Sequence, residues 1–202
     1  MLEIESDGNG KVELGSDGAA AERVLMDRVD ALVLGQGYVD EVKAAEVAVE
    51  VPESPSRILD WLRIARDSRD WRRLERLAAV ALHLHPDGLG PILAAVVASR
   101  APGVNMEDLV DMLGELRAVE AVQPIGALLR ERKDVDGPFY SFCVKGIQAL
   151  GEIGTPEAHE LLRGIAVGEP QEWPAPLRWH AAEELGIEDE LGFDEDQMLG
   201  DG

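Results

Sequence analysis

The order of apolar and polar residues divides the chain into an N-terminal part of mixed pattern and a long part with helical periodicity. Apolar and polar residues alternate over positions 2–5 and 11–14, the period of a half-buried strand, and the turn-forming sequence DGNG separates the two. Residues 46–51 alternate in the same way. Between these segments, residues 20–34 place their apolar residues on one helical face. The pattern therefore predicts a small α+β extension over residues 1–53.

The third strand of this extension has a competing interpretation. Val39, Val42, Ala45 and Val49 recur at intervals of three or four residues, which is the spacing of a helical face. The segment from Asp40 to Val49 is then a helix rather than part of a strand, and the sequence leaves both readings open.

From residue 54 onward the pattern is that of successive helices, without strand-like alternation of comparable quality. Ser54 precedes Pro55, which indicates an N-cap followed by proline at the first helical position. Asp70, Asn105 and Thr155 likewise stand immediately before apolar residues at helical spacing. We expect a mostly α domain over residues 54–190.

An internal repeat is the strongest signal in the sequence. The pair Leu-Gly occurs at Leu113, Leu150 and Leu185, at intervals of 37 and 35 residues, and Leu82 is a weaker member 31 residues upstream. Two antiparallel helices and their turns fill such a period, as in helical solenoids. Glycine after the leucine permits either a close approach of two backbones or a positive φ. The repeat predicts a short α-solenoid of antiparallel helix pairs in which each pair covers the apolar face of the next.

Two segments carry a resemblance to a known family, ALGEIGTPEA at 149–158 and LRWHAAEELG at 177–186. They resemble the HEAT-like repeats of the family first described in phycobilisome lyases, most specifically over residues 105–187. This resemblance implies a curved α-solenoid whose usual work is to hold a protein partner. It does not indicate which partner, because a fold does not determine a function.

Charge narrows the range of partners. The chain has 40 acidic and 19 basic residues and a net charge of −21, which opposes binding to nucleic acid and to anionic membrane surfaces. A partner with a basic surface is favoured instead. Residues 191–202 form an acidic tail that we expect to be disordered. The acidic N-terminus has no signal-peptide pattern and no apolar run is long enough to span a membrane, so we expect a cytoplasmic protein.

One segment has the opposite charge. Six arginines lie between Arg63 and Arg76, close to Trp61 and Trp71, and arginine and tryptophan are enriched at binding hot spots. The alternative is a solvated helix face whose arginines pair with neighbouring acids. Trp173 and Trp179 flank the last interhelical loop and cover the end of the solenoid or add to a partner surface. The candidate partner-binding residues are Trp61, Arg66, Arg69, Arg73, Trp173 and Trp179.

Candidate catalytic or metal-binding groups are few. His83, His85 and Asp87 could bind a metal, but a histidine at a helix C-terminus more often interacts with the last carbonyl groups. Deoxyhypusine hydroxylase, which has similar repeats, uses several His-Glu pairs, whereas this chain has only His159-Glu160. The lone Cys143 lies on an apolar face and is typical of packing. We therefore expect no catalytic residues, no metal site and no cofactor.

The sequence favours a non-catalytic protein-protein interaction module, either an adaptor or an inhibitor. A concrete version is an immunity-type protein that blocks a basic nuclease or toxin. The alternative from another class is a metal- or cofactor-handling protein of the phycobilin-lyase-like HEAT class. A structural subunit of a larger assembly is a third possibility.

Overall fold

The computed structural model describes residues 16–35 and 38–194, and within these ranges the chain forms ten α-helices, one 3-10 turn and no strand. The helices in chain order are α1 (Ser16–Val33), α2 (Glu41–Glu50), α3 (Ser54–Asp67), α4 (Trp71–Leu84), α5 (Leu89–Ser99), α6 (Met106–Glu115), α7 (Val122–Arg132), α8 (Ser141–Ile153), α9 (Pro156–Ala166) and α10 (Ala175–Leu185). The 3-10 turn, Val119–Ala121, precedes α7.

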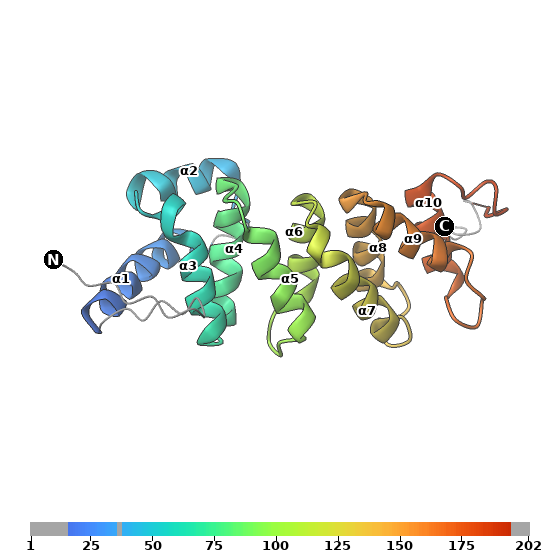
Figure 1. Ribbon diagram of the computed structural model, residues 1–202, viewed down its shortest axis with the longest axis horizontal. Coiled ribbons are helices and arrows are strands. Elements are labelled where there is room, and N and C mark those ends of the chain that lie inside the picture. Colours follow the sequence, from blue (N-terminus) through green and yellow to red (C-terminus); the bar gives the residue numbers. More distant parts are fainter. Residues whose placement is uncertain (1–15, 36–37, 195–202) are drawn as a thin grey trace.

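The helices are packed in neighbouring pairs that follow one another along the long axis of the molecule (Figure 1). Within this row, α6 packs on α8 and α8 on α10, while α5 packs on α7 and α7 on α9. We call α4, α6, α8 and α10 the even layer, and α3, α5, α7 and α9 the odd layer. One continuous cluster of buried apolar side chains runs from Met26 in α1 to Ala182 in α10. Helices α1 and α2 therefore share one hydrophobic core with the helices that follow them.

Several helix starts confirm the capping predicted from the sequence. The side chains of Asp70, Asn105 and Thr155 each accept a hydrogen bond from the backbone N–H three residues later. Such bonds satisfy donors that the first helical turn leaves open. Ser54 is different, because α3 begins at Ser54 itself and its buried hydroxyl has no hydrogen-bond partner in the part of the chain that the structure describes. The prediction that Ser54 caps α3 is wrong, while Pro55 does occupy the first turn.

The N-terminal α+β extension is not seen in the residues that the structure describes. The strand predicted for residues 46–51 is wrong, because α2 runs through most of this segment. Asp40 caps α2 by accepting a hydrogen bond of 2.8 Å from the Lys43 N–H, and Ala44 and Val47 are buried on its inner side. Burial every three or four residues against α4 outweighs the period-two alternation. The other two predicted strands, at 2–5 and 11–14, lie outside the described residues.

The glycines of the Leu-Gly repeat serve both purposes expected of them. Gly114 and Gly151 lie inside helices, where the next helix of the even layer approaches so closely that a Cβ atom would clash with Ala149 and Glu184, respectively. Gly186 instead ends α10 with a φ of +64°, a left-handed conformation that glycine adopts at low cost. Ala149 and Glu184 both immediately precede the leucine of their own repeat, so the next helix meets each glycine at the same repeat position, through the Cα and Cβ of Ala149 in one case and the side chain of Glu184 in the other.

Candidate functional site

Two of the six candidate partner-binding residues are used to hold α1 against α3 and α4. Trp61 is fully buried, and its indole N–H donates to the Glu22 carboxylate of α1. Arg73 donates through Nε to Asp30 at 2.7 Å, and Arg76 donates to the other oxygen of Asp30 at the same distance. The arginine-rich segment thus meets acidic side chains of the chain's own first helix. The part that contains Trp61, Arg73 and Arg76 is hydrogen-bonded to α1. It is therefore neither a solvated helix face nor a surface open to another molecule.

Trp173 and Trp179 also lie inside the molecule, with only 4% and 6% of their surfaces exposed. Trp173 packs against Gly168 in the loop between α9 and α10, and the ring of Trp179 lies beside that of His180. Of the two roles considered for these tryptophans, this placement is that of side chains that cover the end of the helical row.

Arg66 and Arg69 remain near the surface, where they line a hollow of about 340 Å³ together with Trp71. Trp71 is therefore the tryptophan that accompanies these arginines, and the spacing of apolar residues in α3 already distinguishes it from Trp61. Trp61 follows Ile58 by three residues and precedes Ala65 by four, so it belongs to the buried face of α3. Asp67 forms an ion pair with Arg66 beside the hollow, and this pairing reduces the positive charge of the hollow.

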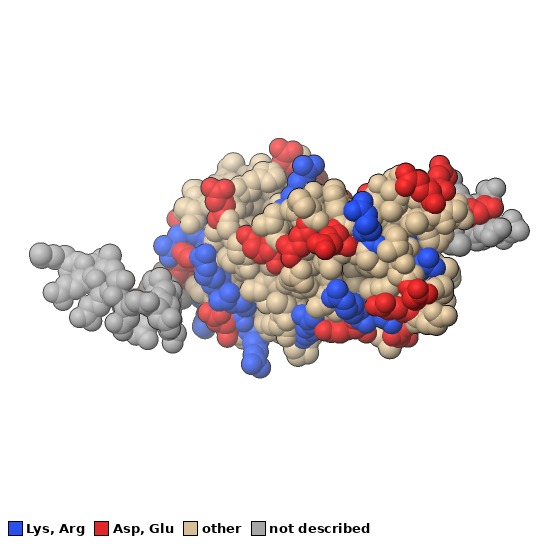
Figure 2. All heavy atoms as spheres, turned by 45° about the vertical axis from the view of Figure 1, so that its right-hand side comes forward, with Lys and Arg blue, Asp and Glu red and all other residues tan. Residues whose placement is uncertain are grey.

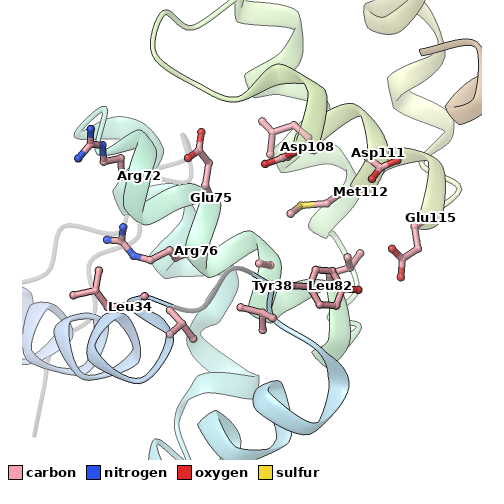
Figure 3. Close-up of a pocket in the computed structure, with 15 residues that line it drawn as sticks. Leu34, Tyr38, Arg72, Glu75, Arg76, Leu82, Asp108, Asp111, Met112 and Glu115 are labelled. Carbon is pink, nitrogen blue, oxygen red and sulfur yellow. The ribbon is translucent and has the colours of Figure 1, made fainter. Parts of the chain in front are cut away.

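A larger pocket of about 610 Å³ lies in the even layer, between α4 and α6, and the segment that joins α1 to α2 borders it. Figure 3 shows Arg72 and Arg76 at the α4 side, and Asp108, Asp111 and Glu115 at the α6 side. Leu34, Tyr38, Leu82 and Met112 provide apolar surface between these charged groups (Figure 3). The size is within the range of about 300–1,000 Å³ that is typical of ligand-binding clefts. Sequence reasoning identified none of these residues as a site.

The position of His83 explains why the even layer opens at this junction. In the repeat, His83 follows Leu82 as Gly114 follows Leu113 and as Gly151 follows Leu150. The glycines let adjacent helices touch, whereas the His83 ring donates from Nε2 to the Val39 carbonyl oxygen at 2.7 Å and packs edge-on to Tyr38. The chain before α2 is thereby held at the side of the pocket.

An acidic row continues from this pocket along the even layer, formed by Asp111 and Glu115 of α6, Glu152 of α8 and Glu184 of α10. Burial raises the pKa of Glu152, and the charges of Asp111 and Glu115 raise it further. Burial also raises the pKa of Glu184, with added repulsion from Glu183 and Glu152. Among the described residues, none of the four carboxylates of the acidic row forms an ion pair.

The charges are thus distributed unevenly over the molecule. Figure 2 shows basic side chains gathered toward the N-terminal end and acidic side chains across the middle and at the opposite end of the face in view. The acidic row repels itself electrostatically, because like charges at short range in a partly desolvated setting raise each other's free energy. Its carboxylates are therefore suited to receive cations from outside the chain.

The candidate metal-binding and nucleophilic residues have other contacts. His85 ends α4 in a left-handed conformation, and His83 bonds to Val39 as described. Within residues 16–35 and 38–194, no group of three or more His, Cys, Asp or Glu side chains could hold a metal ion. Burial, followed by the charge of Asp136, raises the pKa of the Cys143 thiol to about 12. The thiolate that nucleophilic chemistry requires is thus strongly disfavoured.

Comparison with known proteins identifies no relative, since no family model, no curated protein and no solved structure matches this chain. No helix in the described part of the chain is long and apolar enough to cross a membrane.

Proposed function

We propose that this protein is a non-catalytic interaction module that holds a basic protein partner on the acidic row of its even layer. The observation that carries the proposal is a set of four carboxylates on three successive helices of the even layer that form no ion pair with any residue the structure describes. Asp30 of α1 and Glu131 of α7, by contrast, each pair with an arginine.

The electrostatics of the acidic row support a cationic partner. The raised pKa values of Glu152 and Glu184 mean that their ionised forms are disfavoured where they stand. A lysine or arginine of a partner would stabilise the ionised forms by direct pairing. The remaining excess of acidic residues adds long-range attraction, which speeds the encounter with a basic protein.

The architecture supports the same use, and we propose that it is a short HEAT-like α-solenoid. Helix pairs follow in chain order, and the Leu-Gly contact recurs between α6 and α8 and between α8 and α10. Stacked pairs of this kind present one helix of each pair on a continuous surface, which solenoids use for binding. The acidic row crosses such a surface.

The version we favour is an inhibitor of the immunity type, which covers the basic substrate-binding surface of a nuclease or toxin. A nuclease needs basic groups to bind phosphates, and the acidic row offers carboxylates in their place. Inhibition then follows from competition with nucleic acid and needs no catalytic residue in this chain.

The test compares two variants that lose the same charge in different places. One carries Asp111→Asn, Glu115→Gln, Glu152→Gln and Glu184→Gln, and its matched control carries Glu120→Gln, Glu157→Gln, Glu160→Gln and Glu169→Gln, all exposed side chains outside the even layer. Calorimetric titration with a panel of small basic nucleases, at about 0.15 M salt, should detect binding by the parent and by the control. Binding to the first variant should be at least about tenfold weaker. Equal binding by both variants, or no binding to any member of the panel, would overturn the proposal.

A further inference from the structure

We infer that the element of the partner recognised by this chain is an amphipathic basic helix, seated in the pocket between α4 and α6 with its apolar side toward α2. This inference rests on the proposed function, which concerns only a basic partner, and adds the shape and apolar character of what is bound. Three features of the pocket lead to it.

The first feature is exposed apolar surface, part of it lining the pocket and part of it on α2, the helix that follows. Leu34 and Tyr38 line the pocket and still expose 69% and 74% of their surfaces. Val42 and Val49 are equally exposed on the outer side of α2, two helical turns apart. We call these four residues the apolar shelf. Large apolar groups left this open are typical of a surface that another molecule covers.

The second feature is an acidic wall on the α6 side of the pocket. Asp108, Asp111 and Glu115 follow each other on α6 at intervals of three and four residues, so they lie on one face of the helix. Glu75 of α4 adds a carboxylate to the same pocket. A ligand in the pocket therefore meets apolar atoms of Leu34 and Tyr38 and the negative charge of the acidic wall. An amphipathic helix with lysine or arginine on its polar face has this distribution, and helix-in-groove binding is a common mode of peptide recognition.

The third feature is Arg72, which lies at the α4 side of the pocket and forms no ion pair among the described residues (Figure 3). A helix has a partial negative charge at its C-terminus, where its last carbonyl groups are open. Arg72 therefore favours the orientation in which the C-terminal end of the bound helix faces α4. Its neighbour Arg76 is already engaged by Asp30 and does not offer the same contact.

Charge complementarity selects this occupant over others. The acidic wall repels nucleic acid and anionic lipid, both of which require cations. A second copy of this chain would bring further acid, because the net charge is −21. A purely polar cation, such as a lysine-rich coil, would leave the apolar shelf exposed and lose the contribution of its burial.

The experiment measures binding of three synthetic peptides by fluorescence anisotropy, at about 0.15 M salt. The first is a leucine-lysine helix of about 18 residues, or five turns, with leucines at positions i, i+3, i+4 and i+7. The second has the same composition in an order without amphipathicity, and the third is a lysine homopolymer of the same charge. We expect the amphipathic helix to bind at least about tenfold more tightly than the other two.

Two double variants locate the site. Tyr38→Ser with Val42→Ser removes part of the apolar shelf, and both side chains are exposed, so the core is untouched. Val135→Ser with Phe139→Ser removes equally exposed apolar groups from the loop between α7 and α8 and is the matched control. The first double variant should lose the preference for the amphipathic helix, and the control should keep it.

The outcomes separate this inference from the proposed function. If all three peptides bind alike, or if the control loses the preference as fully as the first variant, the inference fails. Binding of basic nucleases that still depends on the acidic row would in that case leave the proposed function standing. If neither the peptides nor the nucleases bind, both fail.

Discussion

The backbone of Gly114 in α6 lies directly against the backbone of Ala149 in α8, so close that a Cβ atom on residue 114 would stand 2.9 Å from the Ala149 Cα. This contact joins two successive helix pairs. One pair later Gly151 occupies the equivalent position, where it lies against the side chain of Glu184. The row of helices therefore depends on missing side chains at specific positions as much as on apolar ones.

Replacing Gly114 with alanine should destabilise the protein, although alanine is intrinsically better than glycine within a helix. The added methyl group meets backbone atoms, which move less readily than a side chain, and overpacking of this kind costs about 1–3 kcal/mol. The matched control is Gly164→Ala in α9, where no atom lies within 4 Å of the added Cβ. The control should gain about 0.5–1 kcal/mol from helix propensity. Urea unfolding followed by circular dichroism measures the free energy of unfolding of both variants. A gain in stability in both would show that α8 does not approach Gly114 this closely.

Replacing Asp30 with asparagine should loosen α1. Asp30 is 9% exposed and accepts hydrogen bonds from both Arg73 and Arg76, so the change removes the paired acid of Arg76 and one of the acids that pair with Arg73, which keeps Asp27 and Asp70. We expect a loss on the order of 2 kcal/mol, below the value for a fully buried pair because both arginines keep contact with solvent. Asp67→Asn removes an exposed ion pair with Arg66 and should cost less than about 0.5 kcal/mol. Hydrogen exchange in α1 that is the same in both variants would refute this role of Asp30.

The stability of the protein should depend on Glu152 and Glu184 in a defined direction. Their folded-state pKa values are raised above the ordinary value of 4.5, mainly by burial, so the folded state binds protons more tightly than the unfolded state. The stability that the two protonated carboxyl groups contribute is fully present when the pH is below their ordinary pKa. It is lost as the pH rises through their raised folded-state pKa values. Glu152→Gln with Glu184→Gln should therefore be more stable than the parent near pH 7 and should lose this advantage near pH 4. Urea midpoints across this range test the sign, and a difference that does not change with pH would count against it.

Cys143 should be inert in the folded protein. Burial and the nearby Asp136 raise its pKa to about 12, so almost no thiolate is present at pH 8. A thiol-specific disulfide reagent should label Cys143 only after denaturant unfolds the chain. Rapid labelling of the native protein would show that α8 opens or that the thiol is less buried than its fully covered position indicates.

Local chemistry accounts for what the sequence predicted correctly. Asp70, Asn105 and Thr155 cap helices through bonds that span three residues, so their role depends on short segments alone. The helical part of the chain was predicted for the same reason. The strand over 46–51 failed because Val47 and Val51 fit both an alternating and a helical period, and contact with α4, remote in sequence, selects the helix.

The candidate site was harder to predict, because it depends on contacts between distant segments. Trp61 and Arg73 are candidate partner-binding residues because of their residue types. In the structure each donates a hydrogen bond to an acidic side chain of α1 about 40 positions away. The pocket likewise unites the end of α1, the middle of α4 and the outer face of α6, which no local pattern relates. Only His83, standing where later repeats have glycine, marks this junction in the sequence.

Carboxyl footprinting of this protein with a basic nuclease that binds it shows directly whether the acidic row is the binding surface. A carbodiimide and an amine label exposed carboxylates, and mass spectrometry locates them with and without the partner. The acidic row predicts protection of Asp111, Glu115, Glu152 and Glu184, while Glu157 and Glu160 on α9 stay labelled. Protection of Glu157 and Glu160 on α9, with the acidic row still labelled, would show that the partner does not bind to the acidic row.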